Sequence, residues 1–275
     1  MQLGIFAKTF AGSDPALVLG AAKAAGYVAV QFNLACAGLP SLPDQIDDEA
    51  GVITQIIAAS RAADVSLAAL SATYNMAHPD PVKRRAGLKG LETAMRVAAG
   101  AGIPLVTLCT GTRHTTDQWA HHPDNAEPSA WADMAAEMAL ALDLAEAHGV
   151  DLGIEPEQAN IVQSTADARR LISDMGSARL KIVFDPANLF EHATAAQARE
   201  IVARSIAPAA GSIAMVHAKD RYADGRFATA GQGVVDFADL LARIRATGFE
   251  GPLVTHGLDA SEAPAVARFL RGLLA

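Results

Sequence analysis

Four side chains that can bind a metal ion stand at the ends of four short apolar runs in the second half of the sequence. The runs are residues 152–154, 182–184, 213–216 and 253–255, and the residues that follow them are Glu155, Asp185, His217 and His256. Successive members of this set are 30, 32 and 39 residues apart, enough chain each time for one strand and one returning helix. Parallel strands joined in this way have their carboxyl ends on one rim, so the four side chains would meet there. Two carboxylates and two imidazoles predict a divalent-metal site and metal-assisted chemistry.

Each of these residues also has an ordinary structural explanation. Glu155 is followed by Pro156 and Glu157, and a strand continuing through them would point both carboxylates to one side, where a buried salt bridge is the alternative. Asp185 directly precedes Pro186 and would equally suit a helix cap. A single histidine at a strand end is more often a hydrogen-bonded core residue than a ligand. One shared metal ion explains the four consecutive positions better than four separate coincidences do.

The rest of the sequence supplies elements that would hold these residues in place. Short apolar segments, which we predict to be strands, cover residues 2–6, 27–32, 66–71, 104–109, 151–155, 181–185, 212–217 and 252–256. Amphipathic segments, which we predict to be helices, cover residues 14–25, 44–63, 81–101, 129–148, 164–176, 194–206, 236–247 and 261–274. Asp14-Pro15 and Asp80-Pro81 are helix-start signals, and glycines at 26, 102, 149 and 248 are stop signals.

This alternation is compatible with a closed barrel or with a doubly wound sheet. A doubly wound nucleotide-binding fold would carry a glycine fingerprint after its first strand, and residues 6–12 have neither GxGxxG nor a Walker A pattern. No linker or shift in composition divides the chain. We therefore expect an α/β fold, a (β/α)8 TIM barrel, as a single domain over residues 1–275.

Composition excludes several classes of function. A net charge of −8 and a pI near 5.4 disfavour a nucleic-acid partner. The two cysteines, Cys36 and Cys109, lie far apart without a CxxC partner, so neither a disulfide framework nor a cysteine zinc site is expected. No apolar run reaches membrane-spanning length and the amino terminus does not resemble a signal peptide. We expect no membrane partner and a cytoplasmic protein.

Four motifs give the chain a family resemblance. They are Gly153-Ile154-Glu155-Pro156, Phe184-Asp185-Pro186-Ala187-Asn188, Val216-His217-Ala218-Lys219-Asp220 and Gly231-Gln232-Gly233-Val234-Val235-Asp236. Over essentially its whole length the chain resembles the xylose-isomerase-like superfamily of barrels, the sugar phosphate isomerase and epimerase group. The resemblance implies that Glu155, Asp185 and His217 hold one divalent ion, often manganese, magnesium or zinc. It also implies a small carbohydrate or polyol substrate and a homodimer or homotetramer.

Two positions depart from the family pattern. His256 stands where the epimerases present a strand-eight glutamate, the partner of the strand-five glutamate in proton exchange on opposite faces of a carbon. An imidazole can still bind a metal, so we keep His256 as a fourth candidate ligand. Asn188 stands where sugar epimerases often have a histidine. Both departures bear on the reaction more than on the fold.

A divalent ion that bridges a carbonyl and an adjacent hydroxyl would stabilise an enediolate, so that a modest base could remove the neighbouring proton. The candidate base is Glu155 or Glu157, and His256, if it is not a ligand, is the candidate acid on the opposite side. The glycines at 231 and 233 more simply form a turn than a phosphate site. The long segment after the fourth predicted strand, flanked by Trp119 and Trp131, suggests a lid or an oligomer contact, with surface packing as the alternative. The candidate substrate-binding residues are Asn75, His78, Arg113, Asn188, Lys219 and Arg221.

Three functions remain open. The first is a metal-dependent isomerase or epimerase of a sugar, sugar phosphate or polyol. The second is a lyase on the same barrel, such as a keto-sugar or keto-inositol dehydratase, which also begins with proton removal next to a carbonyl. The third is a non-catalytic or degenerate sugar-binding barrel in which the rim residues form only an ion-pair network. Endonuclease IV shares the scaffold, but the acidic balance and the few rim histidines disfavour that function.

Overall fold

Eight parallel strands close into a barrel in a computed structural model that describes all residues from 1 to 275. Around the barrel the strand order is β1, β10, β7, β6, β5, β4, β3 and β2, so that each strand pairs with its neighbours along the chain. The strands are β1 (Gln2–Phe6), β2 (Ala29–Phe32), β3 (Ser66–Ser71), β4 (Leu105–Leu108), β5 (Asp151–Ile154), β6 (Leu180–Phe184), β7 (Ile213–Ala218) and β10 (Pro252–Thr255).

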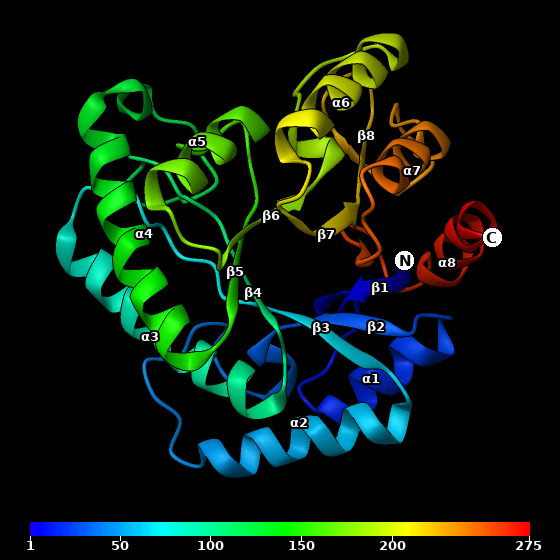
Figure 1. Cartoon of the computed structure of the whole chain (residues 1–275). Coiled ribbons are helices and arrows are strands. Elements are labelled where there is room, and N and C mark those ends of the chain that lie inside the picture. The colour runs from blue at the N-terminus through cyan, green and yellow to red at the C-terminus, as the bar shows by residue number, and fades with distance from the viewer.

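Eight α-helices follow the barrel strands and surround them, as Figure 1 shows. They are α1 (Pro15–Ala24), α2 (Glu49–Ala63), α3 (Pro81–Ala101), α4 (Pro128–His148), α5 (Thr165–Met175), α6 (Ala195–Ala209), α7 (Phe237–Ala246) and α8 (Ala263–Leu274). The (β/α)8 barrel and its single domain are therefore confirmed, and each predicted strand and helix has a counterpart within a few residues.

Helix boundaries follow from local chemistry. The carboxylates of Asp14 and Asp80 accept the backbone N–H groups two residues on, each at 2.8 Å, with proline in the first turn. At the other end, Gly102 and Gly149 end α3 and α4 with a left-handed φ of 70°, a conformation that glycine adopts without a steric cost.

One small antiparallel hairpin was not predicted. It joins β8 (Asp220–Arg221) to β9 (Phe227–Ala228), directly after β7. Strands of two residues are too short to show a period of alternating hydrophobicity. Four short 3-10 helices were also not predicted, because three or four residues are too few to show a helical period. They are η1 (Ala7–Thr9), η2 (Leu34–Ala37), η3 (Pro123–Ala126) and η4 (Pro186–Asn188).

The hydrophobic core has two parts. A cluster of 65 buried residues fills the space between the strands and the helices, and a separate cluster of five lies inside the barrel. The inner cluster consists of Ala69, Leu105, Val183, Met215 and Val254. Both cysteines are free and buried, as expected. None of the helices combines the length and the apolar character that crossing a membrane requires.

Candidate active site at the carboxyl ends of the strands

The side chains of the site lie directly above the inner apolar cluster. Because side chains alternate along a strand, the residue two positions beyond an inward-facing residue faces inward again. Val183 leads in this way to Asp185, Met215 to His217 and Val254 to His256. The same rule applied to all eight strands gives a ring of one residue from each: Phe6, Gln31, Ser71, Thr107, Glu155, Asp185, His217 and His256.

Three members of this ring converge on one point. One candidate ligand atom from each of Glu155, Asp185 and His217 lies within 4.8 Å of the other two. The Nδ1 atom of His217 is 3.4 Å from Oε1 of Glu155 and 3.5 Å from Oδ2 of Asp185. Both Nδ1 of His217 and Oδ2 of Asp185 are buried and lack a hydrogen-bond partner. Buried polar atoms without partners are costly and rare, so these two atoms require a partner.

Asp185 caps a short helix with one oxygen and leaves its other oxygen free for a further partner. Its Oδ1 accepts the backbone N–H of Ala187 at 2.9 Å and so caps η4. Its Oδ2 is left facing His217. The side chain is fully buried, and burial alone would raise its pKa, but the positive charges of Lys219 and His217 hold that pKa below its usual range. Asp185 is therefore a carboxylate at neutral pH.

His217 is held by its second ring nitrogen. Nε2 lies 2.9 Å from Oε1 of Gln31, and Nε2 of Gln31 donates to Oγ1 of Thr107 at 3.0 Å. Burial lowers the pKa of His217, but the nearby carboxylates of Glu155 and Asp185 outweigh it and raise the pKa to about 9. Without a cation in the cluster, His217 is a proton-bearing imidazolium.

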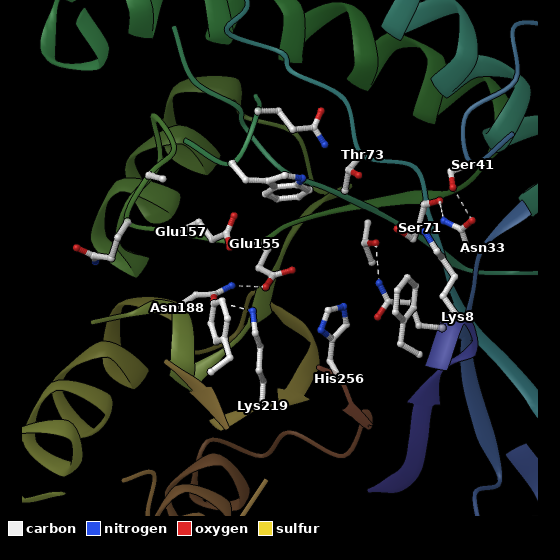
Figure 2. A pocket seen from close by; sticks show the side chains of 18 of the residues that line it. Lys8, Asn33, Ser41, Ser71, Thr73, Glu155, Glu157, Asn188, Lys219 and His256 are labelled. Atoms are coloured by element: carbon white, nitrogen blue, oxygen red, sulfur yellow. Dashed lines mark hydrogen bonds between the residues drawn. The ribbon is translucent and has the colours of Figure 1, made fainter. Parts of the chain in front are cut away.

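Glu155 receives a hydrogen bond from Asn188. Nδ2 of Asn188 donates to Oε1 of Glu155 at 2.6 Å, and Lys219 donates from Nζ to Oδ1 of Asn188 at 3.0 Å. The same ammonium lies 4.0 Å from Oδ2 of Asp185. Figure 2 shows Glu155, Asn188 and Lys219 together on one side of the pocket.

Glu157 lies in the same pocket as Glu155, although β5 ends at Ile154. Burial and the negative charge of Glu155 raise the pKa of Glu157 to about 7. A carboxyl group that titrates near neutrality can both hold and release a proton under physiological conditions. The role of Glu157 in proton transfer stays a prediction.

His256 lies beside the three-residue cluster without joining it. Its ring stacks between those of Phe6 and His217, at centroid distances of 4.8 Å and 5.1 Å. Burial and the positive charges of His217 and Lys219 lower the pKa of His256 to about 3. The ring is therefore neutral at pH 7 in the metal-free cluster, and the role of His256 as the opposing acid stays a prediction. Its buried Nδ1 has no partner, so the role of His256 as a fourth metal ligand also stays a prediction.

The cluster fits a divalent cation. Two ligands that are each about 2.1 Å from one ion in a tetrahedral shell are about 3.4 Å apart, which is the spacing of Nδ1 of His217 from the two carboxylate oxygens. Two carboxylates and one imidazole suit zinc, manganese or magnesium with positions left open for a substrate. The two unpartnered atoms of Asp185 and His217 would then each have a partner.

The hairpin after β7 places two cations at the mouth of the pocket. Lys219 and Arg221 follow His217 at intervals of two, and their charged groups lie 3.9 Å and 4.2 Å from the centre of the Phe227 ring. Arg221 also donates to the carbonyl oxygens of Ala187 and Gly225. Lys219, Arg221 and Asn188 thus line the pocket as expected.

The glycine loop after β9 forms a turn around a buried aspartate. Oδ2 of Asp220 accepts the backbone N–H groups of Gly231 and Gly233, and its Oδ1 accepts those of Val235 and Arg221, at 2.8–3.0 Å. Since Asp220 uses the two glycine amides, these groups are not free to bind a phosphate. The simpler interpretation of this loop as a turn agrees with the structure.

The pocket is a cavity of about 680 Å³, within the range of small-molecule sites. Neutral polar side chains and one lysine cover the wall opposite Glu155, where Figure 2 places Lys8, Asn33, Ser41 and Ser71. Lys8, Ser71 and Thr107 are among the pocket residues that the sequence reasoning did not identify. Continuing the period of two beyond the inner apolar residues Ala69 and Leu105 would have found the last two.

Three predicted substrate-binding residues lie elsewhere. Asn75, His78 and Arg113 do not line the cavity, because their polar groups hold neighbouring loops together. Asn75 bonds to the backbone at 112 and 114, His78 contacts the carbonyl of Thr115 at 3.0 Å, and Arg113 bonds to the carbonyl of Ala77 and pairs with Asp133 at 2.8 Å. We therefore remove them from the candidate site.

The two tryptophans of the segment after β4 differ in position. Trp119 is 50% exposed and lines the cavity, as a residue of a lid would. Trp131 lies in α4, where the guanidinium carbon of Arg170 is 4.0 Å from the centre of its ring. Only Trp119 remains a candidate for contact with a ligand.

Comparison with known proteins agrees with this architecture. A sequence profile described as xylose isomerase-like TIM barrel matches residues 19–273. No protein with a curated description matches the sequence.

Three solved structures illustrate the similarity of fold. 3-Keto-D-glucoside 4-epimerase from E. coli is 18% identical, with a TM-score of 0.77 and 99% of each chain covered. L-Ribulose 3-epimerase is 20% identical, with a TM-score of 0.76, 99% of this chain covered and 93% of the other. A D-tagatose 3-epimerase-like protein is 15% identical, with a TM-score of 0.78, 100% of this chain covered and 97% of the other.

Proposed function

Because the chain belongs to the xylose isomerase-like TIM barrel family, we propose that it is a metal-dependent isomerase or epimerase of a sugar, sugar phosphate or polyol. The reaction would begin with removal of a proton from the carbon beside a carbonyl group. The substrate would be a small carbohydrate or polyol, in keeping with the sugar epimerases that share the fold.

The observation that carries this proposal is the convergence of Glu155, Asp185 and His217. Two of their facing atoms are buried without a partner, and the cluster opens into a cavity lined with polar residues. An ion-pair network alone would have satisfied those atoms at the hydrogen-bonding distances normal for buried groups. This favours a bound cation over the degenerate barrel.

Glu155, Asp185 and His217 would hold the ion, and the ion would supply a positive charge that draws electron density from the carbonyl of the substrate. The chain itself would bind and orient the substrate and move the protons. We assign removal of the carbon-bound proton to Glu155 or Glu157, which both line the cavity. The pKa of Glu157, about 7, suits it to exchange that proton with a substrate oxygen or with solvent.

The hydroxyl groups of the substrate would form hydrogen bonds at the mouth of the pocket with Lys219, Arg221 and Asn188. The stacked ring of His256 would close the opposite side as a neutral group. No specific feature of the site favours the dehydratase alternative over proton exchange alone, so we do not propose it as a second function.

Solvent exchange tests this proposal. The protein, loaded with Mn²⁺, Mg²⁺ or Zn²⁺, is incubated in deuterated buffer with a panel of ketoses, aldoses and keto-polyols. We expect deuterium at the carbon next to the carbonyl in recovered sugars, without loss of water. Glu155→Gln should abolish the exchange, whereas Glu200→Gln, a change at an exposed carboxylate on α6 outside the cavity, serves as the matched control. If the panel shows no exchange and no metal requirement, the result would favour the degenerate barrel.

A further inference from the structure

We infer that Gln31, fixed by Thr107, is a positioning residue that sets which nitrogen of His217 faces the ion. The inference rests on the proposed metal site and concerns a residue that would touch neither the ion nor, in this role, the substrate. It assigns a specific function to one side chain from β2 on the far side of the barrel from Glu155 and Asp185.

The three side chains form a buried chain of hydrogen bonds across the barrel. Gln31 is 3% exposed, Thr107 2% and His217 1%. The amide nitrogen of Gln31 donates to Thr107 at 3.0 Å, and the amide oxygen lies 2.9 Å from Nε2 of His217. Because the nitrogen is taken by Thr107, the oxygen is the atom that His217 meets.

An amide oxygen can only accept a hydrogen bond. The Nε2 atom of His217 must therefore carry the proton, and in the neutral ring Nδ1 then has a free lone pair. That lone pair lies 3.4 Å and 3.5 Å from the oxygens of Glu155 and Asp185. Histidines that bind metals commonly donate their second N–H in this way, which orients the ring.

A reversed amide would give the opposite result. If Gln31 turned its nitrogen toward Nε2, the proton of a neutral His217 would lie on Nδ1 and point at the two carboxylates, where it would exclude a cation. The hydroxyl of Thr107 accepts from Gln31 at 3.0 Å and so holds the orientation in which the amide oxygen faces Nε2 of His217. Thr107 is therefore part of the inference, and its removal should weaken metal binding without any contact to the ion.

Metal affinity of designed variants tests the inference independently of turnover. Gln31→Met keeps the length of the side chain and removes the acceptor, and we expect a loss of roughly 10- to 100-fold in the affinity for Mn²⁺ and Zn²⁺ measured by calorimetry. Gln31→Glu keeps an acceptor and should retain wild-type affinity. Thr107→Val should give a smaller loss. Thr93→Val removes a buried hydroxyl on α3 that bonds to the carbonyl of Asp44, and it is the matched control, with unchanged affinity.

Nuclear magnetic resonance shows which ring nitrogen of His217 carries the proton. In Zn²⁺-loaded protein labelled with ¹⁵N-histidine, we expect the proton of His217 on Nε2. A proton on Nδ1, or equal affinity in wild type and Gln31→Met, would overturn the inference while leaving the metal site standing. If the wild-type protein bound neither Mn²⁺ nor Zn²⁺, the proposed metal site and this inference would fall together.

Discussion

The side-chain amide of Asn188 donates a 2.6 Å hydrogen bond to Oε1 of Glu155, and its oxygen is held at 3.0 Å by Lys219. An ammonium group can only donate, so Lys219 fixes the orientation of the amide and directs its N–H₂ toward the carboxylate. Asn188 was expected to bind substrate from its place in the sequence. Its contacts indicate that it also positions Glu155, the candidate ligand and base.

Replacing Asn188 by Ala should therefore lower kcat/KM rather than the stability of the fold. A hydrogen bond to a charged group contributes about 1.5–3 kcal/mol, equivalent to roughly 10- to 150-fold in rate. Asn188→His, which restores a donor, should recover part of the loss. Steady-state kinetics with any sugar that undergoes exchange provides the measurement. Equal kcat/KM in wild type and Asn188→Ala would show that the bond does not position Glu155.

Metal binding should release a proton from His217. Its pKa of about 9 in the metal-free cluster means that the ring is protonated at pH 7.5, and a ligand nitrogen must be free of its proton. The affinity should therefore rise as the pH increases from 6 to 9, by up to about tenfold per pH unit. Calorimetry in buffers with different ionisation enthalpies should give about one proton released per ion. His217→Gln should bind more weakly and release none, and an affinity independent of pH would contradict the assignment.

Glu157 should make the stability of the metal-free protein depend on pH. Its pKa is raised to about 7, so the folded state holds the proton more tightly than the unfolded chain, and the resulting stabilisation is present at low pH and lost as the pH rises through 7. Urea unfolding should therefore show Glu157→Gln to be close to wild type at pH 4.5 but more stable at pH 8.5. A constant difference at the two pH values would argue against a buried, proton-holding Glu157.

Asp220 should stabilise the loop that carries the pocket cations. It is fully buried and accepts four backbone N–H groups, so Asp220→Ala leaves several buried donors unpaired and should cost about 2–4 kcal/mol of unfolding free energy. Asp224→Ala, on the same hairpin, removes an exposed ion pair with Arg226 and should change the unfolding free energy far less, because solvent screens such a pair. Similar losses in both variants by urea unfolding would show that Asp220 does not anchor the loop.

Distance from a strand end explains which site residues the sequence could predict. Asp185 and His256 stand one residue beyond β6 and β10, where the alternation of the strand still fixes the direction of the side chain. Arg113 stands five residues beyond Leu108, the last residue of β4, and there the chain has left the strand geometry, so its direction depends on contacts with Ala77 and Asp133. Such contacts between distant loops have no local signal in one sequence.

The strand pattern could be predicted because each strand is a short apolar run between helices with clear caps. The environment of His256 could not be predicted from the sequence. Its neutral state depends on burial between two rings and on charges from His217 and Lys219, which only the closed barrel brings together. The same holds for Gln31, which lies 186 residues from His217 in sequence and 2.9 Å from it in space.

The most direct test of the central claim is an anomalous difference map from crystals of the protein grown with Mn²⁺. The account predicts one strong peak about 2.0–2.3 Å from Oδ2 of Asp185, Nδ1 of His217 and a carboxylate oxygen of Glu155, and the map would also show whether His256 is a fourth ligand. A map without a peak at these three atoms, in crystals that contain Mn²⁺ at millimolar concentration, would contradict the claim that they form a metal site.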